Sequence, residues 1–220
     1  MRVSELVERS GVPLATIKYY LREGVLMPGE ATGATKADYG DEHLRRLALI
    51  KALAGAGLPI HKIRVIVRLI DDPGDDLHET IGRAIATLPP YPDGPRSREH
   101  PRARRVLARL GQVYDPAYPA VDQLERALEA VEAVGIPMTD ERLEAYGRHI
   151  RGIAELDLAL MPADSARSAV EYAVLGTAVY EPVIAAMRRL AHQDVAERIL
   201  RRRPTTPPST PPGEPERTAR

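Results

Sequence analysis

The stretch GVPLATIKYY at residues 11–20 decides the fold of the first part of this chain. Gly11 suits the left-handed backbone that ends a helix, and Pro13 is favoured in the first turn of the helix that follows. The apolar residues after Pro13 recur at spacings of three and four, which gives that helix one apolar stripe. A short helix at about residues 4–10 precedes the glycine. Two short helices joined by a tight turn with glycine predict a helix-turn-helix.

The residues that follow predict a wing and a second pair of helices. Residues 25–39 hold one proline and two glycines and little periodicity, and residues 26–27 are expected to pair with residues 36–39 as a small hairpin. Apolar residues at helical spacing then begin after Asp41 and again near Pro59. The sequence DDPG at residues 71–74 ends this unit.

The remaining chain is expected to be helical up to a proline-rich tail. Helices are predicted at about residues 75–88, 98–111, 118–134, 139–160, 166–191 and 192–203. The fold class is therefore mainly α, with an N-terminal winged helix-turn-helix, an all-helical C-terminal domain and a disordered tail. The predicted domains are residues 1–72 (the winged helix-turn-helix), 73–203 (all-helical, with a proline-rich connector near 89–97) and 204–220 (tail). Pro182 predicts a kink or a break within a good helical pattern.

Charge and composition narrow the class of protein. The chain has a net charge of zero, but residues 1–70 hold 11 Lys and Arg against 7 Asp and Glu. When one part of a chain is basic and the rest is acidic, the basic part is expected to contact phosphates. An excess of four positive charges is small enough to arise by chance as well. The sequence contains no cysteine, which excludes disulfides and thiolate metal sites. The first residues lack the apolar stretch of a signal peptide, and the longest uncharged apolar run, residues 173–180, is too short to span a bilayer. We therefore expect a cytoplasmic protein without a membrane partner.

Five short sequence motifs in the first 70 residues resemble those of the MerR family of transcription regulators. They keep the family's order and spacing: VSEL at 3–6, GVPLATIKYY at 11–20, EGVL at 23–26, YGDEHL at 39–44 and GLPIHKI at 57–63. The resemblance implies a winged helix-turn-helix that acts as a dimer on a palindromic promoter site. It also implies an indirect partnership with RNA polymerase, because family members distort promoter spacers so that the polymerase can use them.

The candidate DNA contacts come from the second helix, the wing and the start of the fourth helix. The start of a recognition helix presents side chains to the major groove, cationic groups and tyrosines hold phosphates, and a helix N-terminus attracts anions. The predicted contacts are Ala15, Thr16, Lys18, Tyr19, Arg22, Lys36, Tyr39, His61 and Lys62.

Several of these assignments have a structural alternative. Tyr20 is expected to pack inward, whereas Tyr19, about 100° further round the helix, is not. Lys36 lies where the wings of family members often carry arginine. Its side chain either contacts a phosphate or is simply solvated at the tip of the wing. For His61, a phosphate contact and a side chain that is merely solvated at the start of a helix are equally good interpretations. The adjacent pair Arg45 and Arg46 is a further candidate for reaching the DNA backbone.

The rest of the sequence offers weaker chemistry. The acidic run at residues 71–79 either ligates a hard metal or caps a helix, and we expect no metal, cofactor or catalytic residue. Eight residues of the C-terminal half either line an effector pocket or fill the core: Tyr114, Tyr118, Met138, Tyr146, Met161, Tyr172, Tyr180 and Met187. The amphipathic stretch of residues 165–200 is expected to help form a dimer.

The leading hypothesis is a sequence-specific transcription regulator, which is not an enzyme and is controlled by an unidentified small molecule. The alternative is a helical small-molecule-binding protein or enzyme whose N-terminal part serves assembly.

Overall fold

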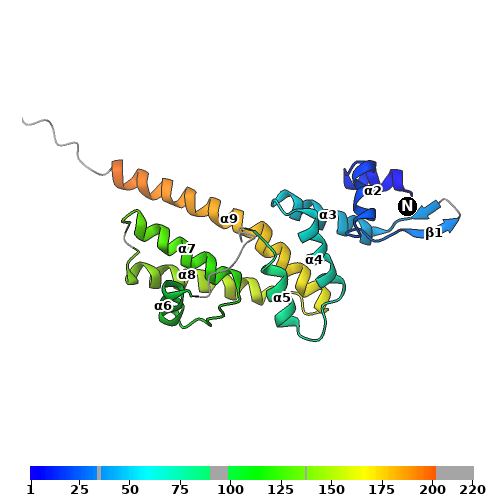
Figure 1. Cartoon of the computed structure of the whole chain (residues 1–220). Helices are drawn as coiled ribbons and strands as arrows, with labels where there is room; N and C mark the ends of the chain where they lie inside the picture. The colour runs from blue at the N-terminus through cyan, green and yellow to red at the C-terminus, as the bar shows by residue number, and fades with distance from the viewer. Residues whose placement is uncertain (34–35, 90–98, 137, 202–220) are drawn as a thin grey trace, which may run out of the picture. The chain divides into compact units, whose positions relative to one another are not determined.

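The computed structural model describes residues 1–33, 36–89, 99–136 and 138–201, and it is mainly helical (Figure 1). The N-terminal elements are α1 (Val3–Ser10), α2 (Leu14–Arg22), β1 (Glu30–Gly33), β2 (Lys36–Asp38), α3 (Asp41–Gly55) and α4 (Ile60–Asp71). They are followed by α5 (Leu77–Ile85), α6 (Pro101–Leu110), α7 (Pro119–Ala133), α8 (Asp140–Ala159) and α9 (Ala166–Arg201). The expected fold class is confirmed for these residues. The predicted tail, and all but the start of the predicted connector, lie outside the described residues.

The contacts divide the chain into two compact units, Met1–Glu181 and Pro182–Arg220. The first unit holds α1 to α8 and the start of α9, and the described part of the second is the remainder of α9. We call α1 to α4 with β1 and β2 the head. The predicted domain boundary at residue 72 stays a prediction.

The main hydrophobic core is built on the head. Its fully buried side chains include Leu6 of α1, Ile17 of α2, Leu47 of α3 and Ile66 of α4. Side chains from outside the head complete this core: Ala84, Leu88, Val170 and Val174. Because α9 begins about a hundred residues after the head ends, local periodicity in the sequence does not reveal this packing.

A second, smaller core joins α6 to α7 through Ala103, Leu107 and Val121. The carboxylate of Glu125 accepts hydrogen bonds from the Ala103 N–H (2.8 Å) and from the Arg102 guanidinium (3.0 Å). Burial acts to raise the pKa of Glu125, but these hydrogen bonds together outweigh it and lower that pKa. Glu125 therefore binds α7 to the first turn of α6 as a charged group.

Helix α9 continues through Pro182, so of the predicted kink or break the break is wrong, and the kink stays a prediction. Proline removes one backbone donor and crowds the preceding turn, which can bend a helix without ending it. By length and composition alone α9 is able to cross a bilayer, with an 18-residue window of mean hydropathy 1.2. However, Ala169, Val170 and Val174 near its start are buried, two of them in the core of the head. We therefore interpret that part of α9 as a core helix.

Candidate nucleic-acid interface

The turn between α1 and α2 has the geometry that the sequence predicted. Gly11 has a φ of 64° and its N–H donates to the Val7 carbonyl (3.0 Å), which closes α1. The Val12 N–H donates to the Ser10 hydroxyl, and the Val12 side chain is buried. The side chain of Ile17 is fully buried and holds α2 against the core. The turn and this single anchor fix which face of α2 is free.

The free face of α2 carries Ala15, Lys18 and Arg22, all of which are exposed. Their spacings of three and four residues place them on one side of the helix. Tyr19 borders this face and is half-buried, and the Arg22 guanidinium lies 5.3 Å from the centre of its ring. Tyr20 is half-buried and packs against the core, as expected. The structure thus groups four predicted contacts into one surface, which we call the α2 face.

Thr16 lies on a different side of α2. It is half-buried, and because it precedes Lys18 by two positions, the two side chains point about 200° apart around the helix axis. A role for its hydroxyl in reading a base edge stays a prediction.

A link between α2 and α4, which the sequence did not reveal, holds the α2 face in place. Arg64 of α4 donates from Nε to the carbonyl oxygen of Glu23 (2.7 Å) and pairs with the Glu23 carboxylate. Glu23 follows the last residue of α2, so this link fixes the C-terminal end of α2 on α4. Both side chains are about 30% exposed or less, which strengthens the pair relative to a fully solvated one. No local pattern signals it, because the partners are 41 residues apart.

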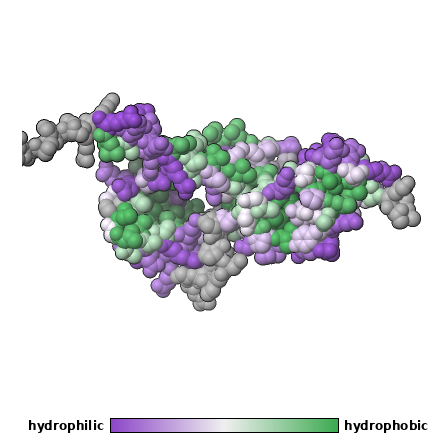
Figure 2. Space-filling view, turned by 90° about the horizontal axis from the view of Figure 1, so that it is seen from above, coloured by the Kyte–Doolittle hydropathy of each residue, from purple (hydrophilic) through white to green (hydrophobic). Residues whose placement is uncertain are grey.

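The wing is an antiparallel pair in which Glu30 faces Asp38 and Ala31 faces Ala37. Its first strand lies further along the chain than expected, because Val25 and Leu26 are buried in the core. Asp38 lies 3.7 Å from the Arg2 guanidinium, which offsets part of its negative charge. The backbone of Lys36 belongs to β2, but its side chain lies outside the part of the chain whose side chains are described. Figure 1 shows the wing and α2 at the same end of the first unit, and Figure 2 shows hydrophilic residues at the surface of that end.

Gly29, just before β1, allows the wing to lie close to Tyr39. A Cβ atom at Gly29 would be 2.7 Å from the Asp38 carbonyl oxygen and 3.1 Å from the Tyr39 ring. We expect Gly29→Ala to lower the free energy of unfolding by about 1–3 kcal/mol, because backbone must shift to admit the methyl group. Urea unfolding checks this, with Gly55→Ala as the control since a Cβ there meets nothing within 4 Å. Equal stability of the two variants would contradict the close packing.

Tyr39 acts mainly as a support at the base of the wing. Its ring lies edge-on to His43 with centroids 5.0 Å apart, and its N–H donates to the Met1 carbonyl (2.8 Å). His43 is buried and accepts from the Gly40 N–H at Nδ1 (3.0 Å), so its proton lies on Nε2, 3.3 Å from the Pro28 carbonyl. These contacts join both strands of the wing to α3. The phosphate contact predicted for Tyr39 remains a prediction.

The candidate DNA contacts at the start of α4 and on α3 differ in their exposure to solvent. His61 is exposed and Lys62 half-buried in the first turn of α4, whose N-cap is Pro59. Arg45 is exposed, but Arg46 is 5% exposed and donates to both carboxylate oxygens of Asp71. The hypothesis that Arg46 reaches the DNA backbone is therefore wrong, because its guanidinium is committed inside the head.

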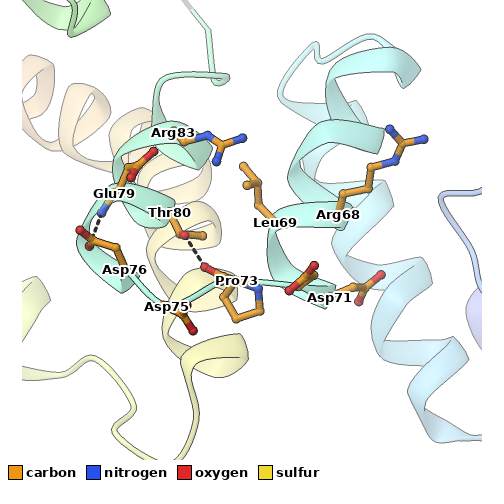
Figure 3. Close-up of a pocket in the computed structure, with 11 residues that line it drawn as sticks. Arg68, Leu69, Asp71, Pro73, Asp75, Asp76, Glu79, Thr80 and Arg83 are labelled. Atoms are coloured by element: carbon orange, nitrogen blue, oxygen red, sulfur yellow. Dashed lines mark hydrogen bonds between the residues drawn. The ribbon is translucent and has the colours of Figure 1, made fainter.

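A cleft of about 580 Å³ lies between the end of α4 and the start of α5 (Figure 3). It is lined by the acidic run, but Asp76 caps α5 by accepting from the Glu79 N–H (2.9 Å), and Asp71 is paired with Arg46. Within the described ranges, no group of three or more His, Cys, Asp or Glu is placed to hold a metal ion. Helix capping therefore accounts for Asp76, and an ion pair accounts for Asp71.

Comparison with known proteins points to one family. The family model described as MerR HTH family regulatory protein matches residues 1–69. The transcriptional regulator HmrR of Rhizobium leguminosarum bv. viciae is 32% identical over 72 residues, which are 33% of this chain and 55% of HmrR. The ZntR homolog of Haemophilus influenzae is 28% identical over 69 residues, 31% of this chain and 51% of that protein. The matches thus span about half the length of these curated relatives.

A solved structure extends the likeness over most of the chain. The crystal structure of SCO5550 from Streptomyces coelicolor A3(2), described as a transcriptional regulator, superposes with a TM-score of 0.66. It is 32% identical in sequence and covers 90% of this chain and 97% of its own. The similarity therefore includes the helices after the head as well as the head.

Proposed function

Because the chain belongs to the MerR family of transcription regulators, we propose that it binds double-stranded DNA sequence-specifically, as a dimer on a palindromic promoter site. The observation that carries this proposal is the α2 face: Ala15, Lys18 and Arg22 are exposed together on a helix that is fixed at both ends. A recognition helix needs such a rigid, solvent-facing surface to enter the major groove. The protein acts on RNA polymerase indirectly, through the shape of the promoter, and works in the cytoplasm.

Within this proposal the predicted contacts divide into two roles. Lys18 and Arg22 hold phosphates beside the groove, while Ala15 and Thr16 approach base edges and Tyr19 packs between them and the backbone. Lys36 and Tyr39 at the wing, and His61 and Lys62 at the start of α4, supply flanking phosphate contacts.

A gel shift on the DNA upstream of the protein's own gene tests the proposal. Retardation that weakens steeply as salt rises is expected, because phosphate contacts release counterions. If neither this DNA nor a neighbouring promoter is retarded, the alternative gains support, namely a helical small-molecule-binding protein or enzyme.

The dimer is proposed to form through α9. In the second unit every residue from Pro182 to Arg201 is exposed, including large apolar side chains such as Val183 (51%), Met187 (63%) and Leu190 (65%). Most of the stability of a helix in a protein comes from packing an apolar face. In a dimer, the α9 helix of a second copy of the chain supplies an apolar surface against which this face packs.

Light scattering at micromolar concentration tests the dimer. The wild-type protein is expected to have twice the mass of the chain, and Met187→Glu with Leu190→Glu is expected to reduce it to the monomer, because two buried charges would be unpaired. Ala185→Glu, which lies on the other side of the helix, is the matched control and should remain a dimer. A monomeric wild-type protein, or an unaffected double variant, would contradict an interface at these residues.

Control by a small molecule is the third part of the proposal, and residues 75–181 are where we place it. Burial raises the pKa of Tyr118, and the charge of Glu181 raises it further. Burial also raises the pKa of Glu181. Tyr118 is one of the residues that the sequence offers as the lining of an effector pocket, and its partial burial against the core of α6 and α7 is the geometry that supports this position.

A further inference from the structure

Arg167, in the first turn of α9, contacts two different helices of the head. Its Nη2 lies 2.7 Å from Oε1 of Glu42 on α3 and 3.5 Å from Oδ1 of Asp71 on α4. Asp71 is the same residue that holds the buried guanidinium of Arg46. We call Glu42, Arg46, Asp71 and Arg167 the α9 latch. It connects α3, α4 and α9 through one continuous set of charges.

Two kinds of contact hold the start of α9 on the head, and they do different things. Val170 and Val174 are fully buried in the core of the head, and they supply the attraction. Hydrophobic burial by itself has no preferred direction. The hydrogen bond from Arg167 to Glu42 is directional, since the N–H must point at its acceptor. The ion pair with Asp71 adds a second point of contact on another helix. Two such contacts on separate helices therefore define an angle that packing alone leaves open.

Stability is a poor explanation for Arg167. Its side chain is 42% exposed, and those of Glu42 and Asp71 are 52% and 45% exposed. Ion pairs with this much solvent contact add little to the free energy of folding. The geometry of the pairs, rather than their strength, is what Arg167 contributes.

We propose that Arg167 is a positioning residue, which fixes the angle of the first turns of α9 on the DNA-binding head so that the two heads of a dimer match the two halves of the palindromic site. The inference rests on the proposed function, since it needs a dimer that uses both heads at once. Binding by the second head is then an intramolecular step, and its advantage disappears when the geometry no longer fits. Binding to a single half-site uses one head and does not depend on that angle.

The test compares two DNA duplexes: the bound site with its inverted repeat intact, and the same site with one half scrambled. Arg167→Gln is expected to bind the intact site several-fold to tenfold more weakly than the wild type, while its affinity for the scrambled site stays within twofold. Arg9→Gln is the matched control, because Arg9 is similarly exposed and its ion pairs, with Asp41 and Glu5, stay within the head. It should leave both affinities unchanged.

Charge reversal provides the rescue. Arg167→Glu is expected to weaken binding to the intact site further, and adding Glu42→Arg should restore part of the affinity because the pair is rebuilt with opposite signs. Failure of the swap to restore binding would overturn the proposal, as would an equal weakening on both duplexes, which would show that Arg167 is merely structural. If the wild-type protein itself binds both duplexes equally, the proposed palindromic dimer fails instead, so the two failures are distinguishable.

Discussion

Replacing Asp71 with alanine is expected to lower the free energy of unfolding by about 3 kcal/mol. The reason is the guanidinium of Arg46, whose side chain is 4% exposed and which donates to both oxygens of this carboxylate. Breaking a buried pair by removing one partner typically costs about 3–5 kcal/mol, because the remaining charge stays buried without compensation. We expect the lower end of that range, since Asp71 itself is 45% exposed.

Urea unfolding of three variants checks this expectation. Asp72→Ala is the control, because Asp72 is an exposed neighbour of the same type and should change stability by less than about 0.5 kcal/mol. The double variant Arg46→Met with Asp71→Ala should recover much of the stability, since an apolar side chain of similar length is tolerated at a buried position. If Asp71→Ala were as stable as Asp72→Ala, the buried pair would not be part of what holds α3 on α4.

Replacing Lys18 and Arg22 together with alanine is expected to weaken DNA binding by about 10- to 100-fold at moderate salt. Removing one phosphate interaction also reduces the slope of log affinity against log salt by about 0.9, so the double variant should reduce it by about 2. Alanine is the best helix former, and both side chains are exposed, so α2 should remain folded. The weaker binding would therefore reflect missing phosphate interactions rather than an unfolded helix.

Fluorescence anisotropy with labelled promoter DNA, measured over a range of salt concentrations, gives both quantities. Lys51→Ala is the control, because Lys51 is an exposed cation on α3 that the proposal leaves without a role. Its salt slope should equal that of the wild type. A double variant with an unchanged slope would mean that the α2 face does not contact phosphates.

The local geometry of the head could be predicted from the sequence because short-range rules determine it. Gly11 closes α1 in the left-handed conformation, and the turn that follows sets α2, as the glycine and proline spacing indicated. The exposed position of Lys18 and the inward packing of Tyr20 followed from helical periodicity alone. These features need only residues that are close in the sequence.

The contacts that position the site could not be predicted, because their partners are far apart in the chain. Glu23 and Arg64 are 41 residues apart, and Arg46 and Asp71 are 25 apart. In the sequence Arg46 looked like another surface cation beside Arg45, whereas tertiary packing buries it. The return of α9 to the core of the head is likewise invisible to periodicity, which reports that a helix has an apolar face but not what covers that face.

Mapping the DNA bound by the wild-type protein across its genome, with the Lys18→Ala, Arg22→Ala double variant in parallel, tests the central claim most directly. We predict a small set of promoter sites that share an inverted repeat, that include the DNA upstream of the protein's own gene, and that the variant no longer binds. A wild-type protein that enriches no site above the variant would contradict the assignment of the α2 face as a DNA-binding surface.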